Sequence, residues 1–252
     1  MSHLVLENVT LRFGGLLALD DVSFSVAPGS LHALIGPNGA GKSSCFNVIS
    51  GLYRPTSGGV RLGDNDLLQL RPHQVARLGI GRAFQNTALS QHSTVLDNVL
   101  LGRHALTKGG FIACGLRLTR RGEQRHADRA KEICDFLGIS AMVDKPLGAL
   151  PYGVAKRVDI ARALAVEPSL LLLDEPAAGM NTDETADLAA TIGQIRTDLG
   201  IAILLVEHDM DLVMGIADQV TVLDFGRVIA DGTPTEVQTN ADVIKAYLGA
   251  SA

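Results

Sequence analysis

The stretch GPNGAGKSS at residues 36–44 has the spacing G-x-x-x-x-G-K-[ST] of a phosphate-binding P-loop. A mostly apolar run, LHALI at residues 31–35, comes directly before it and predicts a short strand. After it, Phe46, Ile49 and Leu52 recur at helical spacing and predict an apolar-faced helix. Strand, loop and helix in this order distinguish a true P-loop from an accidental glycine-rich turn.

Each part of this loop has a role in holding phosphate groups. Glycines allow the backbone to curl so that its N–H groups face phosphate oxygens, and the start of the helix adds positive potential. We expect Lys42 to bridge the β- and γ-phosphates and the Ser43 hydroxyl to bind Mg²⁺. The predicted nucleotide-binding residues of the loop are Gly36, Pro37, Asn38, Gly39, Ala40, Gly41, Lys42, Ser43 and Ser44.

Two later apolar runs end in polar residues, LLLLDEP at 170–176 and IAILLVEHD at 201–209. Such runs are typical of strands buried on both faces of an α/β sheet, and ligands bind at the carboxyl edge of these sheets. We expect Asp174 to hold Mg²⁺ through water and Glu175 to orient the attacking water. If the two strands are neighbours, His208 can donate a hydrogen bond to a γ-phosphate.

Taken alone, each of these polar residues has a plainer interpretation. Acids after a strand often cap the next segment, and a single histidine is more often structural than catalytic. Gln85, in RAFQN, is an ordinary surface glutamine on this view, although a neutral amide can also ligate Mg²⁺ and contact the attacking water. The P-loop in the same chain favours the interpretation of all of them as parts of a nucleotide site.

The remaining pattern predicts an α/β fold preceded by antiparallel strands. VTLRF at 9–13 and VSFSV at 22–26 alternate apolar and polar residues, which is typical of strands that cover a core on one side. VTVLDFG at 220–226 is another continuous apolar run and predicts a further buried strand. Between about 89 and 162 strand signals disappear and apolar residues recur at helical spacing, so we expect a helical insertion there.

Composition limits the possible classes of protein. The chain has 252 residues, 46% of them hydrophobic, and a net charge of -5, which argues against a general nucleic-acid binder. No apolar run approaches the roughly 20 residues that span a bilayer, and the N-terminus lacks the pattern of a signal peptide. Three widely spaced cysteines indicate a reduced, cytosolic protein. Of these, Cys45 is expected to be a small core residue rather than a nucleophile.

Residues 117–131, RLTRRGEQRHADRAK, carry six Arg or Lys residues against two acids. We interpret them as the solvated face of a helix. Contact with phospholipid headgroups or with an acidic loop of a partner is the alternative, but Gly122 and the interspersed acids weaken the positive patch.

Six motifs in order resemble those of the nucleotide-binding subunits of ABC transporters: GPNGAGKS, Gln85, LPYGV at 150–154, LLLLDEP, AAGMN at 177–181 and EHD at 207–209. The resemblance implies ATP and Mg²⁺ as ligands. It also implies that Phe13 stacks on adenine, although Phe13 also continues the apolar face of its strand and can instead face the core. Two such subunits pack head to tail, so that the P-loop of one and the LPYGV segment, the signature, of the other enclose each ATP.

The resemblance also implies an architecture. We expect one ABC ATPase domain over residues 1–252, with a P-loop NTPase (RecA-like) core, an N-terminal antiparallel β-subdomain and an inserted helical subdomain. Residues 1–88 and 163–252 form the predicted nucleotide-binding core, and residues 89–162 the helical subdomain with the signature.

A finer likeness is to the ATP-binding subunits of branched-chain amino acid importers, carried by RFGGLLAL at 12–19, VEHDMDLVMGIAD at 206–218 and the tail DGTPTEV…DVIKAYLG. It implies transmembrane permease subunits, a second ATPase subunit, an extracytoplasmic substrate-binding protein and a peripheral place on the cytoplasmic face of the inner membrane. By the same resemblance, Gln85 and the helical insertion receive a segment of the permease. A lipid or lipopolysaccharide exporter subunit and a non-catalytic nucleotide-gated module are the alternatives.

Two motifs depart from the usual pattern of the family. The common signature is Leu-Ser-Gly-Gly-Gln, whereas this chain has Leu150, Pro151, Tyr152, Gly153 and Val154. Proline suits the first turn of a helix, so we expect the helix to form and the N–H groups of Gly153 and Val154 to remain as phosphate donors to the partner's ATP. The loop after Glu175 ends in Asn181 instead of aspartate, and its amide is expected to hydrogen-bond across the dimer.

Overall fold

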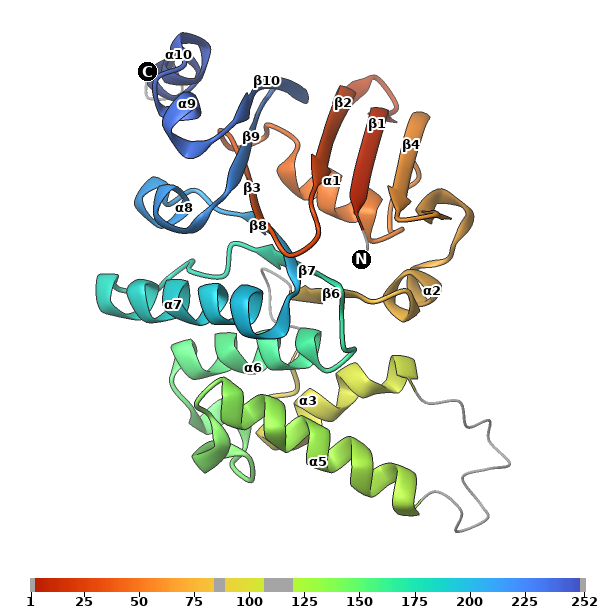
Figure 1. The fold of residues 1–252 in the computed structure, drawn as a ribbon, viewed down its shortest axis with the longest axis vertical. Helices are drawn as coiled ribbons and strands as arrows, with labels where there is room; N and C mark the ends of the chain where they lie inside the picture. The colour runs from red at the N-terminus through yellow and green to blue at the C-terminus, as the bar shows by residue number, and fades with distance from the viewer. Residues whose placement is uncertain (1–2, 84–88, 107–119, 250–252) are drawn as a thin grey trace.

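The structure, a computed structural model, describes residues 3–83, 89–106 and 120–249. Figure 1 shows two β-sheets at one end of the molecule and a group of helices at the other. The strands are β1 (Leu4–Phe13), β2 (Leu16–Val26), β3 (Leu31–Ile35), β4 (Ser57–Leu62), β5 (Asn65–Asp66), β6 (Ile80–Ala83), β7 (Leu170–Asp174), β8 (Ala202–Val206), β9 (Gln219–Asp224) and β10 (Arg227–Gly232).

The first sheet has the order β2-β1-β4-β5, with antiparallel pairing throughout. In β1 the side chains of Val9 and Leu11 are buried while Arg12 is exposed, as the alternating pattern predicts. The β1–β2 hairpin pairs Phe13 with Leu16 at its tip. The expected antiparallel β-subdomain is therefore confirmed.

The second sheet has the order β10-β9-β3-β8-β7-β6. Neighbouring strands in this sheet are parallel, except that β9 and β10 pair antiparallel. Every residue of β3, β7 and β8 is buried, because helices and the first sheet cover both faces. The three apolar runs at 170–176, 201–209 and 220–226 thus form strands as predicted. β6 gave no such signal, since IGRA is short and contains glycine and arginine.

The helices are α1 (Lys42–Ile49), α2 (Pro72–Arg77), α3 (Val95–Arg103), α5 (Arg120–Phe136), α6 (Tyr152–Leu164), α7 (Thr182–Leu199), α8 (Met210–Ile216), α9 (Pro234–Gln238) and α10 (Ala241–Gly249). The expectation that Leu52 belongs to the P-loop helix is wrong, because α1 ends at Ile49 and Leu52 is half exposed. The chain turns at Gly51, whose φ of 72° is left-handed, and this conformation ends the helix. None of the described helices is long and apolar enough to cross a membrane.

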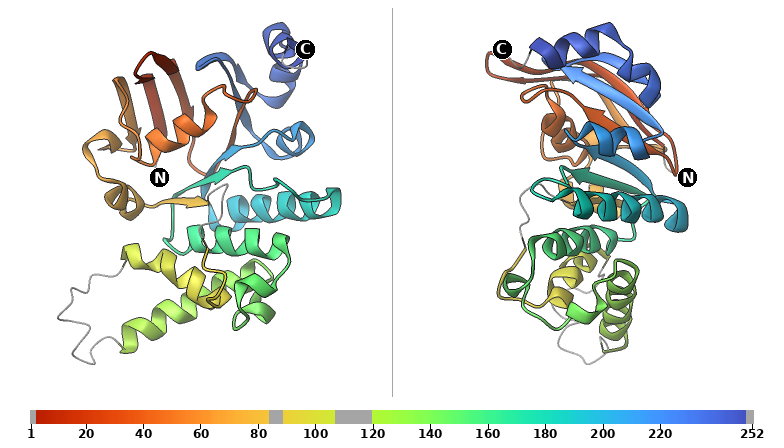
Figure 2. Two further views of the ribbon diagram at one scale, coloured as in Figure 1. Left: turned by 180° about the vertical axis from the view of Figure 1, so that it is seen from behind. Right: turned by 90° about the vertical axis from the view of Figure 1, so that its left-hand side faces the viewer.

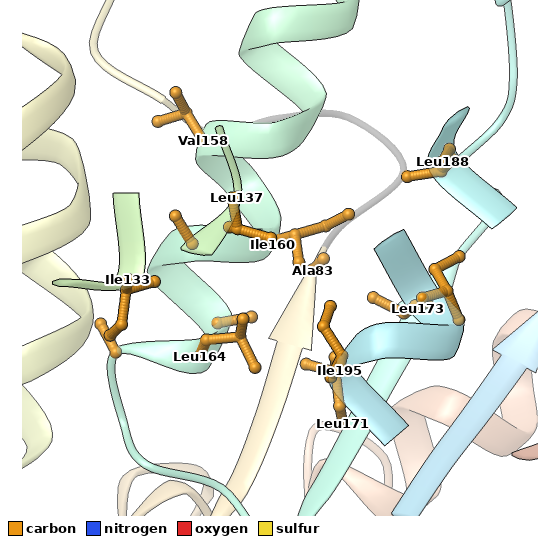
Figure 3. Packing of buried hydrophobic residues seen from close by; sticks show 14 of the residues in the cluster. Ala83, Ile133, Leu137, Val158, Ile160, Leu164, Leu171, Leu173, Leu188 and Ile195 are labelled. Carbon is orange, nitrogen blue, oxygen red and sulfur yellow. The ribbon is translucent and has the colours of Figure 1, made fainter. Parts of the chain in front are cut away.

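Within the described residues 89–106 and 120–162 lie α3, α5 and most of α6, joined by turns and short 3-10 helices. In Figure 2 the yellow and green helices gather at the end of the molecule opposite the C-terminal helices. Of these helices, α6 lies next to the second sheet. It contacts β6 and β7 as well as the helices α3 and α5. Figure 3 shows the shared core, in which Ile133 of α5, Val158 and Ile160 of α6 and Leu171 of β7 belong to one buried cluster.

The described part of the basic segment lies on α5. Arg125, Arg129 and Lys131 are exposed, whereas Ala130 and Ile133 on the same helix are buried. Arg129 also pairs with Glu132 at 2.7 Å and with Glu167 at 3.4 Å, which offsets part of the positive charge. This arrangement is what a solvated helix face requires.

Cys45 lies inside α1 and is fully buried. Burial raises the pKa of its thiol to about 12, and the thiolate is the reactive form. We therefore expect iodoacetamide to leave Cys45 unmodified in the folded protein at pH 8 and to modify it rapidly after denaturation. Peptide mass spectrometry measures both. Labelling of native Cys45 at the rate of a free thiol contradicts its assignment to the core.

Gly36 begins the loop between β3 and α1 at φ 145°, and a Cβ there would lie 2.0 Å from the carbonyl oxygen of Leu223. We expect Gly36→Ala to lower the free energy of unfolding through both left-handed strain, roughly 1–2 kcal/mol, and overpacking against backbone, roughly 1–3 kcal/mol. Gly39→Ala is the control, because Gly39 is also left-handed but has open space at its Cβ. Urea unfolding of both variants measures the difference, and equal losses contradict the clash.

Candidate active site

Three loops meet at the carboxyl edge of the second sheet. β3, β8 and β7 are parallel neighbours in that order, so the segments that follow Ile35, Val206 and Asp174 begin at the same edge. The N–H of Glu175 extends the ladder by donating to the carbonyl of Val206 at 2.9 Å. The P-loop, the Asp174–Glu175 pair and His208 are thus brought to one place, as the sequence predicts.

The P-loop curls through left-handed glycines. Gly39 has φ 83° and Gly41, directly before α1, has φ 107°. A Cβ at Gly41 would lie 2.7 Å from the carbonyl oxygen of Ala18, so β2 holds the loop closely from outside. This geometry leaves Ser43 exposed in the first turn of α1, where the N–H groups precede the first intrahelical hydrogen bonds.

Lys42 folds back over the loop. Its Nζ donates to the carbonyl oxygens of Gly36 at 2.6 Å and Pro37 at 3.1 Å, and the residue is 7% exposed. Desolvation lowers the pKa of Lys42, while the nearby charges of Glu175 and Asp174 act in the opposite direction. The side chain is therefore a buried cation close to both acids.

Asp174 is buried at the end of β7, with 5% of its surface exposed. Its Oδ2 accepts a hydrogen bond from Arg82 Nη2 at 3.2 Å, whereas its buried Oδ1 has no hydrogen-bond partner among the described residues. Burial raises the pKa of Asp174, and the charge of Arg82 opposes this shift. A buried carboxylate oxygen without a donor among the described residues fits the oxygen ligands that Mg²⁺ takes, and Asp174 ends its strand at the sheet edge where the P-loop begins.

Glu175 adopts a left-handed backbone conformation with φ 48°. For a residue with a Cβ this costs roughly 1–2 kcal/mol, so the surrounding contacts must hold it. One of them comes from Lys156 on α6, whose Nζ donates to the Glu175 carbonyl at 3.3 Å. Lys156 is 3% exposed and also lies 5.5 Å from the ring centroid of Tyr152. No pattern of neighbouring residues distinguishes Lys156, which in the sequence is only one basic residue of a predicted helix.

His208 follows β8 with an exposed side chain, 61% of which is accessible. Beside it, Glu207 is fully buried and joins two loops. Its Oε1 accepts from the Ala177 N–H at 2.8 Å, and its Oε2 from the His208 N–H at 3.2 Å. Burial raises the pKa of Glu207, and these hydrogen bonds oppose that shift. In the sequence, Glu207 is distinguished only as an acidic residue directly after an apolar run, and this pattern does not reveal its role in joining the two loops.

Phe13 is at the end of β1 and 44% exposed, so the alternative that it faces the core is wrong. Its ring meets that of Tyr53 edge to face, with the centroids 5.1 Å apart. Tyr53 is itself 39% exposed. An accessible aromatic surface therefore lies at the tip of the hairpin whose second strand borders the P-loop.

Gln85 lies outside the described residues.

The signature segment stands at the start of α6. Pro151 is the residue before the helix, not its first residue, and its carbonyl accepts from Val154 N–H at 3.0 Å and Ala155 N–H at 3.2 Å. The expectation that the Val154 N–H stays available as a phosphate donor is therefore wrong. The N–H groups of Tyr152 and Gly153 precede these hydrogen bonds. Leu150 is half-buried against the helical core.

Asn181 caps the next helix, α7. Its Oδ1 accepts from the Glu184 N–H at 3.0 Å, and the Glu184 carboxylate accepts from the Asn181 N–H at 3.0 Å. Glu184 Oε1 also lies beside Gly153, and Tyr152 beside Gly179. The signature and the Asn181 loop of this chain are therefore in contact with each other.

Comparisons with known proteins agree with this geometry. The profile of the family described as "ABC transporter" matches residues 19–178, and one described as "Branched-chain amino acid ATP-binding cassette transporter" matches residues 227–252. The chain is 42% identical to the high-affinity branched-chain amino acid transport ATP-binding protein BraF of Pseudomonas aeruginosa, covering 99% of each chain.

Solved structures are similar over nearly the same length. The ADP conformation of MJ1267, an ATP-binding cassette of an ABC transporter, superposes with a TM-score of 0.87 at 32% identity, covering 99% of both chains. The dimeric structure of MJ0796, a bacterial ABC transporter cassette, has a TM-score of 0.78 at 26% identity, covering 92% of this chain and 98% of that one. The chain belongs to the ABC transporter family, as one of its ATP-binding, ATP-hydrolysing subunits.

Proposed function

We propose that this ATPase couples ATP-driven closure of a dimer to the import of branched-chain or related amino acids. The observation that carries the substrate class is the C-terminal match at residues 227–252 to a family described by branched-chain amino acid transport. The full-length similarity to BraF supports the same assignment and disfavours a lipid or lipopolysaccharide exporter. Lys42, Asp174, Glu175 and His208 are all present, which disfavours a non-catalytic module.

The proposed roles follow from the position of each side chain. The curled P-loop and Lys42 bind the phosphates, and Ser43 and Asp174 hold Mg²⁺, which when bound neutralises charge on the β- and γ-phosphate oxygens. Glu175 orients the attacking water at the edge of the sheet. His208 donates a hydrogen bond to the γ-phosphate, since its side chain is exposed directly after β8. Phe13 offers its exposed ring to adenine. Gln85 remains a proposed ligand of Mg²⁺ and contact of the water.

The second ATPase subunit contributes its signature to this site, and this chain contributes its own to the partner. Pro151 has neither a hydroxyl nor an N–H to offer, so the Tyr152 and Gly153 N–H groups remain for the partner's ATP. Each charge-assisted contact that is lost is worth roughly 1.5–3 kcal/mol. We propose that in a heterodimer the two ATP sites are therefore unequal, and that Asn181 hydrogen-bonds across the interface.

A groove of about 400 Å³ lies between the core and the helical insertion. Leu52 after α1 and Leu101 on α3 line it, and each is about half exposed. We propose that it receives a segment of a transmembrane permease, with residues 89–162 acting as the helical subdomain and residues 1–88 and 163–252 as the core. The chain then lies peripherally on the cytoplasmic face of the inner membrane, and an extracytoplasmic binding protein delivers the amino acid to the permease.

The assignment of Glu175 is tested by Glu175→Gln, which keeps the shape of the side chain but removes its negative charge. We expect ATP binding to persist while turnover falls by roughly 10²–10⁴-fold, the range of general-base contributions. The variant also accumulates as a closed dimer in the presence of ATP. Steady-state ATPase assays and light scattering measure the two effects, and turnover close to that of the wild type would remove Glu175 from its role.

The transport assignment is tested by purifying the tagged chain from its native membrane in mild detergent. We expect permease subunits to co-purify, and leucine uptake by cells to be lost on deletion and restored by the wild-type chain. The matched control is the Lys42→Ala chain, which should recover the permeases without restoring uptake, because it lacks the phosphate-binding cation. Recovery of no membrane protein, or uptake unchanged by deletion, contradicts the proposal.

A further inference from the structure

Arg82 is a buried side chain that contacts two separate parts of the nucleotide site. It lies on β6, and its side chain is only 10% exposed. Nη2 donates to Asp174 Oδ2 at 3.2 Å, while Nη1 donates to Asn47 Oδ1 at 2.9 Å and to Ser50 Oγ at 3.0 Å. Asp174 ends β7, whereas Asn47 belongs to α1 and Ser50 follows its last residue.

The guanidinium is also held by packing. It lies 5.6 Å from the ring centroid of Phe46, which is fully buried on α1. Its backbone is held in the sheet, where Arg82 pairs with Leu172 of β7. A planar guanidinium with two engaged nitrogens sets the relative position of its partners more tightly than a flexible ammonium. Arg82 thus connects the P-loop helix to the strand that carries Asp174.

These two elements carry two of the three proposed protein ligands of Mg²⁺. Ser43 is in the first turn of α1, and Asp174 is the last residue of β7. The contact with Arg82 engages one carboxylate oxygen of Asp174 and leaves the other, Oδ1, buried without a hydrogen-bond partner among the residues described. The hydrogen bond from Arg82 to Oδ2 restricts rotation of the carboxylate and so favours one direction for Oδ1.

We propose that Arg82 is a positioning residue for the magnesium site: it holds Asp174 with Oδ1 presented to the hydrated ion and ties that carboxylate to the helix that carries Ser43. The inference rests on the proposed roles of Asp174 and Ser43. Residues that orient metal ligands from outside the coordination sphere typically change metal affinity by about 10–100-fold when replaced.

Charge alone predicts the opposite effect. A fixed cation near a divalent ion repels it, so removing Arg82 would strengthen Mg²⁺ binding if repulsion dominated. If Arg82 mainly orients Asp174, its removal weakens Mg²⁺ binding, whereas if it mainly repels the ion, its removal strengthens Mg²⁺ binding. The direction of the change in magnesium dependence decides between them.

The experiment measures binding of the fluorescent analogue TNP-ATP to the isolated full-length chain, once with excess EDTA and once across a titration of MgCl₂. We expect Arg82→Met to raise the Mg²⁺ concentration for half-maximal effect by about 10-fold or more, with the affinity in EDTA unchanged within about threefold. Methionine keeps an apolar stem against Phe46 and removes the hydrogen bonds and the charge.

The matched control is Arg103→Met. Arg103 is equally buried, with 9% of its side chain exposed, and forms an ion pair of similar length, 3.1 Å, with Glu167, but it lies on α3 outside the site. Its loss should lower stability without changing the Mg²⁺ titration. A shift in the control equal to that of Arg82→Met would overturn the inference, because general loosening would then explain both.

Arg82→Lys separates the bridge from the charge. Lysine retains a cation but cannot reach Asp174 and α1 with one rigid fork, so we expect a Mg²⁺ titration shifted toward that of Arg82→Met. Asn47→Ala removes the hydrogen bond between Asn47 and Arg82 and should give a smaller shift of the Mg²⁺ titration in the same direction. If Arg82→Met does not fold, this variant tests the positioning role in its place.

Two outcomes contradict the inference and leave the ATPase assignment unaffected. One is an unchanged or lower Mg²⁺ concentration for half-maximal effect in Arg82→Met, and the other is a wild-type Mg²⁺ titration of Arg82→Lys.

A different result contradicts the proposed function instead. If the wild-type chain binds TNP-ATP equally with and without Mg²⁺, the magnesium roles of Asp174 and Ser43 fall, and the inference falls with them.

Discussion

Backbone hydrogen bonds join β3 to β8 and β8 to β7 as parallel neighbours in the middle of the second sheet. Because parallel strands point the same way, the loops after all three begin at one edge, and this places the P-loop, the Asp174–Glu175 pair and His208 together. Apart from His32 in β3 and Asp174 at the end of β7, these strands are apolar, and helices and the first sheet exclude water from both faces. Chemistry is therefore confined to the residues where the strands end.

That confinement places charges where water is scarce. Lys42, Arg82, Lys156, Asp174 and Glu207 are all largely buried, and each has a hydrogen-bonding partner that offsets part of the desolvation cost. Lys42 bonds within its own loop, whereas the partners of the other four lie on different elements, so those contacts also hold the loops of the site to the strands and helices around them. Among the residues that the structure describes, the buried Asp174 Oδ1 has no hydrogen-bond partner, and such an oxygen is suited to interact with a metal ion.

The unusual signature takes on a structural meaning from its surroundings. Tyr152 stands where the common pattern has glycine, and its ring lies against Gly179 and near the ammonium of Lys156. Lys156 in turn supports the backbone of Glu175. Pro151 accepts the first hydrogen bonds of α6 through its carbonyl, so the missing N–H costs the helix nothing. The departures from the common motif thus preserve the helix and fasten it to the loop after β7.

The amino-acid sequence by itself determined the class of the fold and most of the site, because a P-loop, alternating strands and apolar runs are patterns of neighbouring residues. Only the tertiary structure decided how Arg82, Lys156 and Glu207 take part, where α1 ends and which N–H groups of the signature remain available. The physical reason is separation along the chain. Arg82 and Asp174 are 92 positions apart, and Ala177 and Glu207 are 30 apart. Such contacts form only when the strands pair, so a pattern of neighbouring residues does not predict them.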